Sequence, residues 1–349
     1  VGNDSMAFDF DYGVQNCVYE YNYSHDNLGG FLMLCPGPGA TVNNIARYNV
    51  SVNDGKYDGA PVIRMGTGKY GSLGVQIYNN TMYWENNGGY TMSLTPHSAW
   101  EGQAIKDVSV FNNIFYGPVK ADSMSTKEGV TYSNNLVYSS DGSAEAVYEA
   151  LSNDAHAVYA DPQFADVTDY TAGSWTDGQT TLGTVEGFRI AKTSPAVDAG
   201  MAIPEAPAYT DDTLGGELVA NEAQIPSVDY YGNALTDGTP DIGANETVKT
   251  DDAQKAIEAN AEAAKAQIDA LENLSQEQKD DFKAQIDAVV ENAAKALDEA
   301  QTNAEIKAAQ AAADSAMNVI KAAAAKADED AKPQPEPKPA DGLGMDKDG

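Results

Sequence analysis

The segment AFDFDYG (residues 7–13) carries two carboxylates at a spacing that suits acid–base chemistry. Asp9 and Asp11 alternate with aromatic residues, which is the period of a β-strand, so both acids should lie on one face and the aromatic side chains on the other. The Cα atoms of two such acids are roughly 6.6–6.8 Å apart. Asp4 adds a third acid upstream, and the nearest arginine or lysine in sequence is Arg47. These carboxylates must therefore be solvated, bind a cation or act in catalysis.

Paired carboxylates are the catalytic groups of most glycoside hydrolases. Retaining enzymes hold them about 5–5.5 Å apart and inverting enzymes about 6.5–9.5 Å apart, so the strand spacing alone leaves both mechanisms open. Two other interpretations remain. A polysaccharide lyase would use aspartates to hold Ca²⁺ and a basic residue to abstract a proton, but Lys and Arg are scarce before residue 105. A non-catalytic adhesin would share the same scaffold.

Composition limits the partners. The chain has 349 residues and a net charge of −32, so binding to nucleic acid, which needs cationic side chains, is disfavoured. A neutral oligosaccharide fits this charge better than an acidic one. No stretch of 18 apolar residues occurs, so no membrane span is predicted. The two cysteines, Cys17 and Cys35, are too few for a disulfide framework. They are either buried thiols or one pair that faces across neighbouring turns of the fold.

An internal repeat dominates residues 1–249. In each repeat, two short β-type runs flank an asparagine, and turns rich in Gly, Pro and Ser separate the repeats. This pattern predicts a right-handed parallel β-helix, in which the asparagine side chains of successive coils stack and bond one another as a ladder. The aligned asparagines are Asn22, Asn49, Asn80, Asn113 and Asn135.

A polar stripe should follow this ladder. Asp26, Asn53 and Trp84 each lie four residues past a ladder asparagine, and His25 and Asp54 neighbour the first two. If the coils are in register, these five residues form hydrogen-bonding groups beside a flat ring, the mixture that recognises sugars. No His/Cys cluster has the spacing of metal ligands. We therefore predict no cofactor and no metal site, and leave a structural Ca²⁺ ion open.

The C-terminal part has a different character. Residues 250–328 are rich in Ala, Glu and Lys, and their apolar period predicts three helices at 253–271, 281–300 and 304–327. The sequence SQEQ (275–278) is a capping box that marks the start of the second helix. Residues 329–349 are charged and Pro-rich, which is typical of a disordered linker.

Two resemblances refine this interpretation. The strings SPAVDAG (194–200) and DIGANE (241–246) resemble the C-terminal caps of secreted bacterial β-helix proteins, so Asp198 and Asp241 should be turn and capping acids. The helical part resembles the FIVAR-type three-helix modules of Gram-positive surface proteins. This resemblance implies either a spacer or a module that associates with sugars or the cell wall.

Residues 2–35 resemble the core of the β-helix lacto-N-biosidases of glycoside hydrolase family 136. These retaining enzymes release lacto-N-biose from milk oligosaccharides, and their two catalytic aspartates lie seven residues apart. The resemblance implies that Asp4 and Asp11 are the acid/base and the nucleophile without deciding which is which. We expect Asp4 to be the acid/base and Asp11 the nucleophile, with Asp9 raising the pKa of the acid by like-charge repulsion. That family has further coils before this point. We therefore expect a piece of a longer, extracellular or surface-attached protein.

Overall fold

The computed structural model describes residues 5–37, 39–65, 71–94, 105–120, 128–176, 179–209, 220–235 and 239–333. The chain divides into two compact units, Val1–Val248 and Lys249–Gly349. The division lies one residue from the position at which the composition changes. Each unit is described below by itself.

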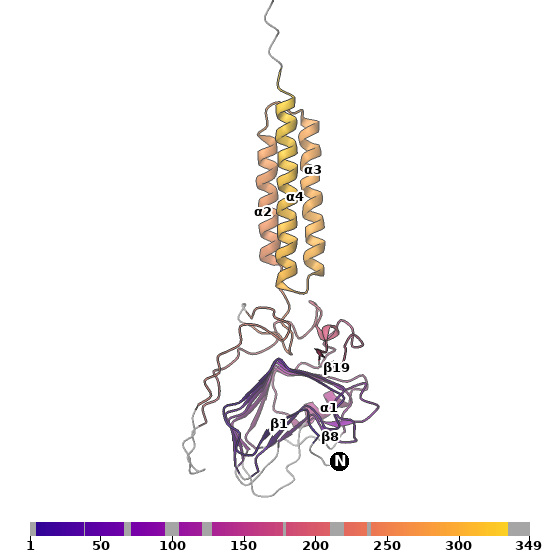
Figure 1. Cartoon of the computed structure of the whole chain (residues 1–349), viewed down its shortest axis with the longest axis vertical. Helices are drawn as coiled ribbons and strands as arrows, with labels where there is room; N and C mark the ends of the chain where they lie inside the picture. The colour runs from indigo at the N-terminus through magenta and orange to yellow at the C-terminus, as the bar shows by residue number, and fades with distance from the viewer. Residues whose placement is uncertain are drawn as a thin grey trace, which may run out of the picture. The chain divides into compact units, whose positions relative to one another are not determined.

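Parallel strands make up most of the regular structure in the described part of the first unit (Figure 1). One three-stranded sheet contains β1 (Phe8–Asp11), β4 (Leu32–Cys35) and β9 (Ile63–Met65), and another contains β5 (Thr41–Val42), β10 (Ser72–Leu73) and β14 (Ile105–Lys106). The first five-stranded sheet contains β2 (Val18–Glu20), β6 (Ile45–Arg47), β11 (Gln76–Tyr78), β15 (Val108–Phe111) and β17 (Val130–Ser133). The second contains β3 (Tyr23–His25), β7 (Val50–Val52), β12 (Thr81–Tyr83), β16 (Ile114–Tyr116) and β18 (Leu136–Tyr138).

The remaining elements of this unit are short. They are the parallel pair β8 (Ala60–Pro61) and β13 (Met92–Ser93), the antiparallel pair β19 (Ser174–Thr176) and β20 (Gln179–Thr181), helix α1 (Ser143–Leu151) and the 3₁₀ turn η1 (Glu186–Phe188).

Strands of successive repeats lie side by side, so the internal repeat of the sequence is also a repeat in space. The same position of each repeat then faces the core. In the first five-stranded sheet, one column of side chains in register contributes to one apolar cluster. Alternating side chains of a strand point to opposite faces, so the intervening positions face outward. The column consists of Tyr19, Ala46, Ile77, Val110 and Tyr132.

The predicted asparagine ladder is confirmed. The Oδ1 atom of each later asparagine accepts the backbone N–H and the Nδ2–H of the preceding one, at 2.8 to 3.1 Å. The residue before each asparagine has a left-handed backbone, with φ between 50° and 57°. The chain thus turns sharply between two strands, and the amide side chains satisfy backbone groups that the turn leaves buried. These turn residues are Tyr21, Tyr48, Asn79, Asn112 and Asn134.

The acid of the DIGANE motif has the predicted capping role. Asp241 is fully buried, its Oδ1 accepts the N–H of Asp198 at 2.8 Å, and its Oδ2 accepts the N–H of Thr247. Gly243 of the same motif has a φ of 102°, and a Cβ there would lie 2.5 Å from Ile114 Cδ1. The motif therefore closes tightly over the end of a strand, which explains why it carries a glycine and an acid.

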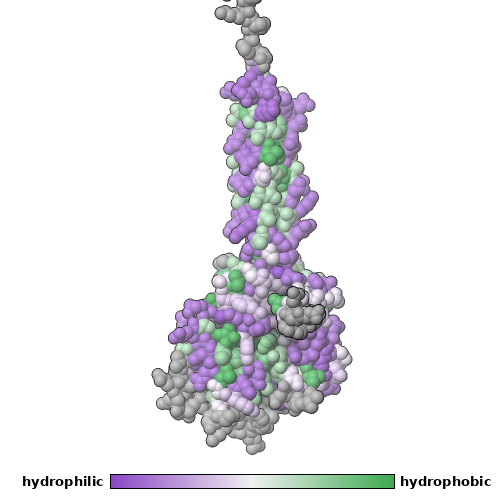
Figure 2. All heavy atoms as spheres, in the orientation of Figure 1, coloured by the Kyte–Doolittle hydropathy of each residue, from purple (hydrophilic) through white to green (hydrophobic). Residues whose placement is uncertain are grey.

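The second unit contains three helices, α2 (Asp251–Asp269), α3 (Gln276–Glu299) and α4 (Asn303–Asp330). Figure 2 shows hydrophilic residues along the sides of this unit and a band of more hydrophobic residues down the middle of the face in view. The predicted capping box at Ser275 is present, and a second one joins Thr302 and Glu305. No helix in the described part of the chain has the length and apolar character needed to cross a membrane.

Candidate active site

Aromatic packing fixes the strand that carries the acids. The ring of Phe10 is fully buried and stacks on Tyr19 with centroids 4.7 Å apart, and Phe8 packs against the same ring at 5.3 Å. The Tyr19 hydroxyl donates to the backbone carbonyl of Asp9 at 2.9 Å. Because Phe8 and Phe10 face inward, the alternation of β1 turns Asp9 and Asp11 to the outer face.

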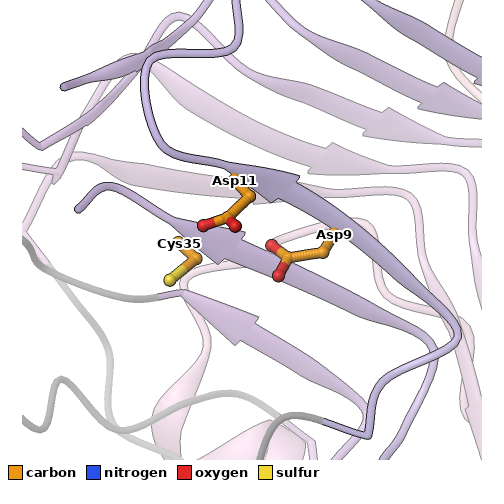
Figure 3. A group of neighbouring side chains, drawn as sticks. All are labelled: Asp9, Asp11 and Cys35. Carbon is orange, nitrogen blue, oxygen red and sulfur yellow. The ribbon is translucent and has the colours of Figure 1, made fainter. Parts of the chain in front are cut away.

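The two acids meet a cysteine on the neighbouring strand (Figure 3). β1 pairs with β4 in the register Asp11↔Cys35. One oxygen of each carboxylate and the Cys35 sulfur all lie within 4.8 Å of one another. Asp9 and Asp11 are half-buried, whereas Cys35 is 7% exposed. Figure 3 shows all three side chains on the same face of the sheet.

The sequence did not reveal this thiol as part of the site, because Asp11 and Cys35 are far apart along the chain and only strand pairing brings them together. Neither cysteine forms a disulfide: Cys17 is exposed and Cys35 is buried. The prediction of a buried thiol is therefore right for Cys35 and wrong for Cys17. Two carboxylates and a thiolate are groups that bind zinc-like ions, but three ligands of this kind also occur together without a metal.

The same outer face carries a basic residue. The register Asp9↔Met33↔Arg64 places Arg64 two strands from Asp9, which is roughly 9.6 Å between Cα atoms. Residues in register on neighbouring parallel strands point to the same face, so Arg64 shares the face of Asp9 and Met33. The face therefore carries two carboxylates and one guanidinium. Alternation within a single strand does not reveal this combination of negative and positive charges.

Tyr12 departs from the predicted alternation. It follows the end of β1 and is 57% exposed, so it does not join Phe8 and Phe10 in the core. Its ring lies over Gly37, where a Cβ would stand 1.8 Å from the Tyr12 Cδ1 atom. Its N–H donates to Asp11 Oδ1 and to the Cys35 carbonyl, at 3.0 and 3.1 Å. An exposed aromatic residue thus directly follows the strand that carries the carboxylates.

Asp4, predicted as the second catalytic aspartate, lies outside the described residues. Its distance from Asp11 therefore stays a prediction. Within the described part of the chain, Asp9 is the carboxylate that the structure brings to Asp11.

The predicted polar stripe lies on a different sheet from the acids, because His25 ends β3. His25 Nδ1 lies 3.0 Å from Asp26 Oδ2, and Lys56 Nζ lies 2.7 Å from Asp26 Oδ1. Partial burial by itself would raise the pKa of Asp26, but the hydrogen bonds from Lys56 and His25 hold that pKa below its usual value. These side chains form a partly exposed ionic cluster that is separate from Asp9 and Asp11.

The other three residues of the stripe are buried, so the expectation of an exposed stripe is wrong for them. Asn53 and Trp84 are each 2% exposed, and the Trp84 indole lies in the core with Nε1 donating to the Pro118 carbonyl at 2.9 Å. Asp54 is also 2% exposed. It points inward because Ser24 and Ser51 both donate to its Oδ2 at 2.6 Å.

Burial raises the pKa of Asp54 even though hydroxyl groups and the Asn27 amide stabilise its carboxylate. This acid is a polar group satisfied inside the fold and is out of reach of a ligand at the surface.

The candidate site therefore consists of Asp9, Asp11 and Tyr12, with Cys35 on the neighbouring strand and Arg64 on the strand after that. A pair of carboxylates this close matches the separation in retaining glycosidases more nearly than that in inverting ones.

Comparison with known proteins points to the same class of chemistry. Over 253 residues the chain is 29% identical to a protein named lacto-N-biosidase from Bifidobacterium longum subsp. longum. This similarity covers 70% of the chain and 14% of the relative, so the chain spans a small part of that protein. It is compatible with a glycosidase function. No solved structure matches the chain.

The helical unit has a separate relationship. Residues 249–325 match the family model described as Domain of Unknown Function (DUF1542). This match begins at the first residue of the second compact unit. The description of the family names no ligand, so the comparison assigns this unit a class of module and no partner.

Proposed function

We propose that this chain is part of a glycoside hydrolase that acts on a neutral oligosaccharide by a retaining mechanism. The observation that carries the proposal is the pair Asp9 and Asp11, whose carboxylate oxygens lie within 4.8 Å on an outer sheet face. The named activity of the similar protein supports the reaction class. The net charge of −32 favours a neutral substrate over an acidic one.

The proposed reaction has two steps. Asp11 attacks the anomeric carbon while a protonated carboxyl group donates its proton to the departing glycosidic oxygen, which forms a glycosyl–Asp11 ester. The second carboxylate then removes a proton from water, and the resulting attack releases the sugar and regenerates Asp11. The observed pair makes Asp9 the acid/base candidate among the described residues. The resemblance makes Asp4 the acid/base instead, and the assay below separates the two. The exposed ring of Tyr12 suits the apolar face of a sugar.

The finer proposals follow from the resemblance. The substrate is a lacto-N-bioside, the stacked parallel strands are a right-handed β-helix, and the reaction needs no cofactor. The protein works outside the cell, and the helical unit with the Pro-rich segment after it attaches the protein to the cell surface. A non-catalytic surface protein that binds carbohydrate is the alternative, and turnover separates it from the hydrolase.

The test uses two substrates with different leaving groups. The chain is assayed on lacto-N-tetraose and on p-nitrophenyl lacto-N-bioside, as wild type and as Asp4→Asn, Asp9→Asn and Asp11→Asn. Asp169→Asn is the matched control, because Asp169 is an exposed carboxylate outside this sheet. We expect Asp11→Asn to abolish turnover of both substrates, because the amide of asparagine cannot form the ester.

The acid/base variant should behave differently. Its turnover of lacto-N-tetraose should fall by a factor on the order of 10²–10⁴ relative to the wild type. Its turnover of the nitrophenyl substrate should fall much less, because that leaving group needs little protonation. Whichever of Asp4→Asn and Asp9→Asn shows this pattern identifies the acid/base. The hydrolase proposal is wrong if the wild-type chain binds these glycans without cleaving them. The assignment of Asp11 is wrong if Asp11→Asn keeps wild-type turnover.

A further inference from the structure

A polar cavity of about 280 Å³ lies on a different sheet from the two acids. Gln76 of β11 and Ser109 of β15 stand side by side in register on its floor. Asp107, which precedes β15, lines one part of the wall, and Tyr209 lines another. The cavity therefore combines an amide, a hydroxyl, a carboxylate and an aromatic ring.

The Gln76 side chain supports the floor of this cavity. The residue is 8% exposed, and its Nε2 donates to the Glu205 carbonyl at 2.9 Å. That bond fixes the orientation of the amide, because the reversed amide would place two oxygens against each other. Among the described residues, the buried Oε1 atom has no hydrogen-bond partner. Because this oxygen has almost no accessible surface, it lies behind the cavity lining, and Gln76 supports the floor without contacting a ligand through Oε1.

The wall opposite the sheet is built firmly. The Tyr209 N–H donates to Asn43 Oδ1 at 2.8 Å, and Asn43 Nδ2 donates to the Tyr209 carbonyl at 3.1 Å. Gly74 allows this close approach, since a Cβ there would lie 2.6 Å from Tyr209 Cβ. The aromatic wall is thus held in place in the absence of a ligand, as is usual for small-molecule sites.

The chemistry of the lining selects the ligand. The Asp107 carboxylate is an acceptor only, and the Ser109 hydroxyl can both donate and accept. Such a set suits a molecule with several hydroxyl groups, whereas an anion would be repelled by Asp107 and by the net charge of −32. A volume of about 280 Å³ is just below the range for drug-sized ligands, which fits one sugar ring with an apolar face toward Tyr209.

We propose that this cavity is a second, non-catalytic binding site for a single neutral sugar ring. The inference rests on Asp107, Ser109 and Tyr209, and it stands whether or not Asp9 and Asp11 perform hydrolysis. A site of this kind would hold a glycan chain at a distance from the carboxylates and raise its local concentration.

Saturation-transfer difference NMR on the full chain tests the site, with galactose and N-acetylglucosamine titrated separately. Ser109→Phe fills the cavity, and Asp107→Asn removes the charge while keeping a residue type that tolerates the φ of 52° at this position. Thr131→Phe is the matched control, because Thr131 is the next residue in the same outward column and does not line the cavity. Circular dichroism checks that each variant is folded.

We expect at least one of the two sugars to bind to the wild type and to Thr131→Phe. Binding should be lost in Ser109→Phe and weakened about tenfold or more in Asp107→Asn, as for loss of a hydrogen bond to a charged group. The proposal is overturned if neither sugar gives a signal, if both cavity variants bind as the wild type does, or if the cavity takes Ca²⁺ and no sugar. None of these readouts depends on hydrolysis, so failure of the hydrolase proposal would leave this test unaffected.

Discussion

The asparagine ladder makes a quantitative prediction about stability. Asn80 stands in the middle of the ladder and is fully buried. Its Oδ1 accepts the N–H and Nδ2–H of Asn49, at 3.0 and 2.8 Å. Its Nδ2 donates to the carbonyls of Ala46 and Tyr78 and to Asn113 Oδ1, at 2.9 to 3.0 Å. The variant Asn80→Ala removes all five hydrogen bonds and leaves a small void.

The size of the destabilisation by Asn80→Ala depends on which buried groups lose every hydrogen-bond partner. The Asn49 N–H is buried and loses its acceptor, which costs about 1–3 kcal/mol. The other partners lose one bond each, at about 0.5–1.5 kcal/mol, and Asn113 Oδ1 keeps its bond from the Asn80 N–H. Allowing for non-additivity among these neighbours, we expect a loss of about 3–5 kcal/mol in the free energy of unfolding. For a unit of this size, that lowers the melting temperature by on the order of 10 °C.

The assay is thermal and urea unfolding followed by circular dichroism, with Asn22→Ala as the matched control. Asn22 ends the ladder, is only half-buried, and donates to the Glu20 carbonyl and to Asn49 Oδ1. Its loss should cost about 1 kcal/mol. Asn80→Asp should be at least as damaging as Asn80→Ala, because it sets a carboxylate oxygen against three acceptors. Equal losses for Asn22→Ala and Asn80→Ala would refute the view that the buried ladder stabilises the stacked repeats.

Two further predictions concern a buried acid and a helix cap. Because burial raises the pKa of Asp54, the folded state binds its proton more tightly than the unfolded chain does. The stability of the wild type should therefore fall relative to that of Asp54→Asn as pH rises above about 3.9, and parallel pH profiles of unfolding would contradict this. In the helical unit, Ser275→Ala removes the capping box and should cost about 1 kcal/mol, whereas Ser275→Thr should cost little. Thermal melts of the two cap variants decide the point.

Prediction from sequence succeeded where the signal repeats or is local. The ladder asparagines recur at equivalent positions, so their stacking follows once the strands pair in parallel. The capping box at Ser275 depends on four consecutive residues. The buried side of β1 was predicted for Phe8 and Phe10, because alternation within one strand determines it. For Tyr12 the alternation failed, because the strand ends one residue earlier.

Prediction failed where the direction of a side chain depends on the geometry of a corner. Asp26 and Asn53 occupy equivalent corner positions, with φ values of 56° and 55°. Trp84, the next residue in that column, does not share this left-handed conformation, and its ring turns into the core. Asp54 turns inward because two serine hydroxyls offer it hydrogen bonds inside the coil. None of these side-chain directions can be deduced from the spacing of residues along the sequence alone.

The sequence by itself determined the repeating strands, the asparagine columns, the helical unit and the presence of two acids on one strand face. Those features are encoded by periods of a few residues and by repeats of the same residue type. Only the tertiary structure decided that Cys35 and Arg64 share the face with Asp9 and Asp11, and that Gln76 and Ser109 form the floor of a separate cavity. Such neighbours come from different repeats and are joined only by pairing between strands, so their proximity exists only once the chain has folded.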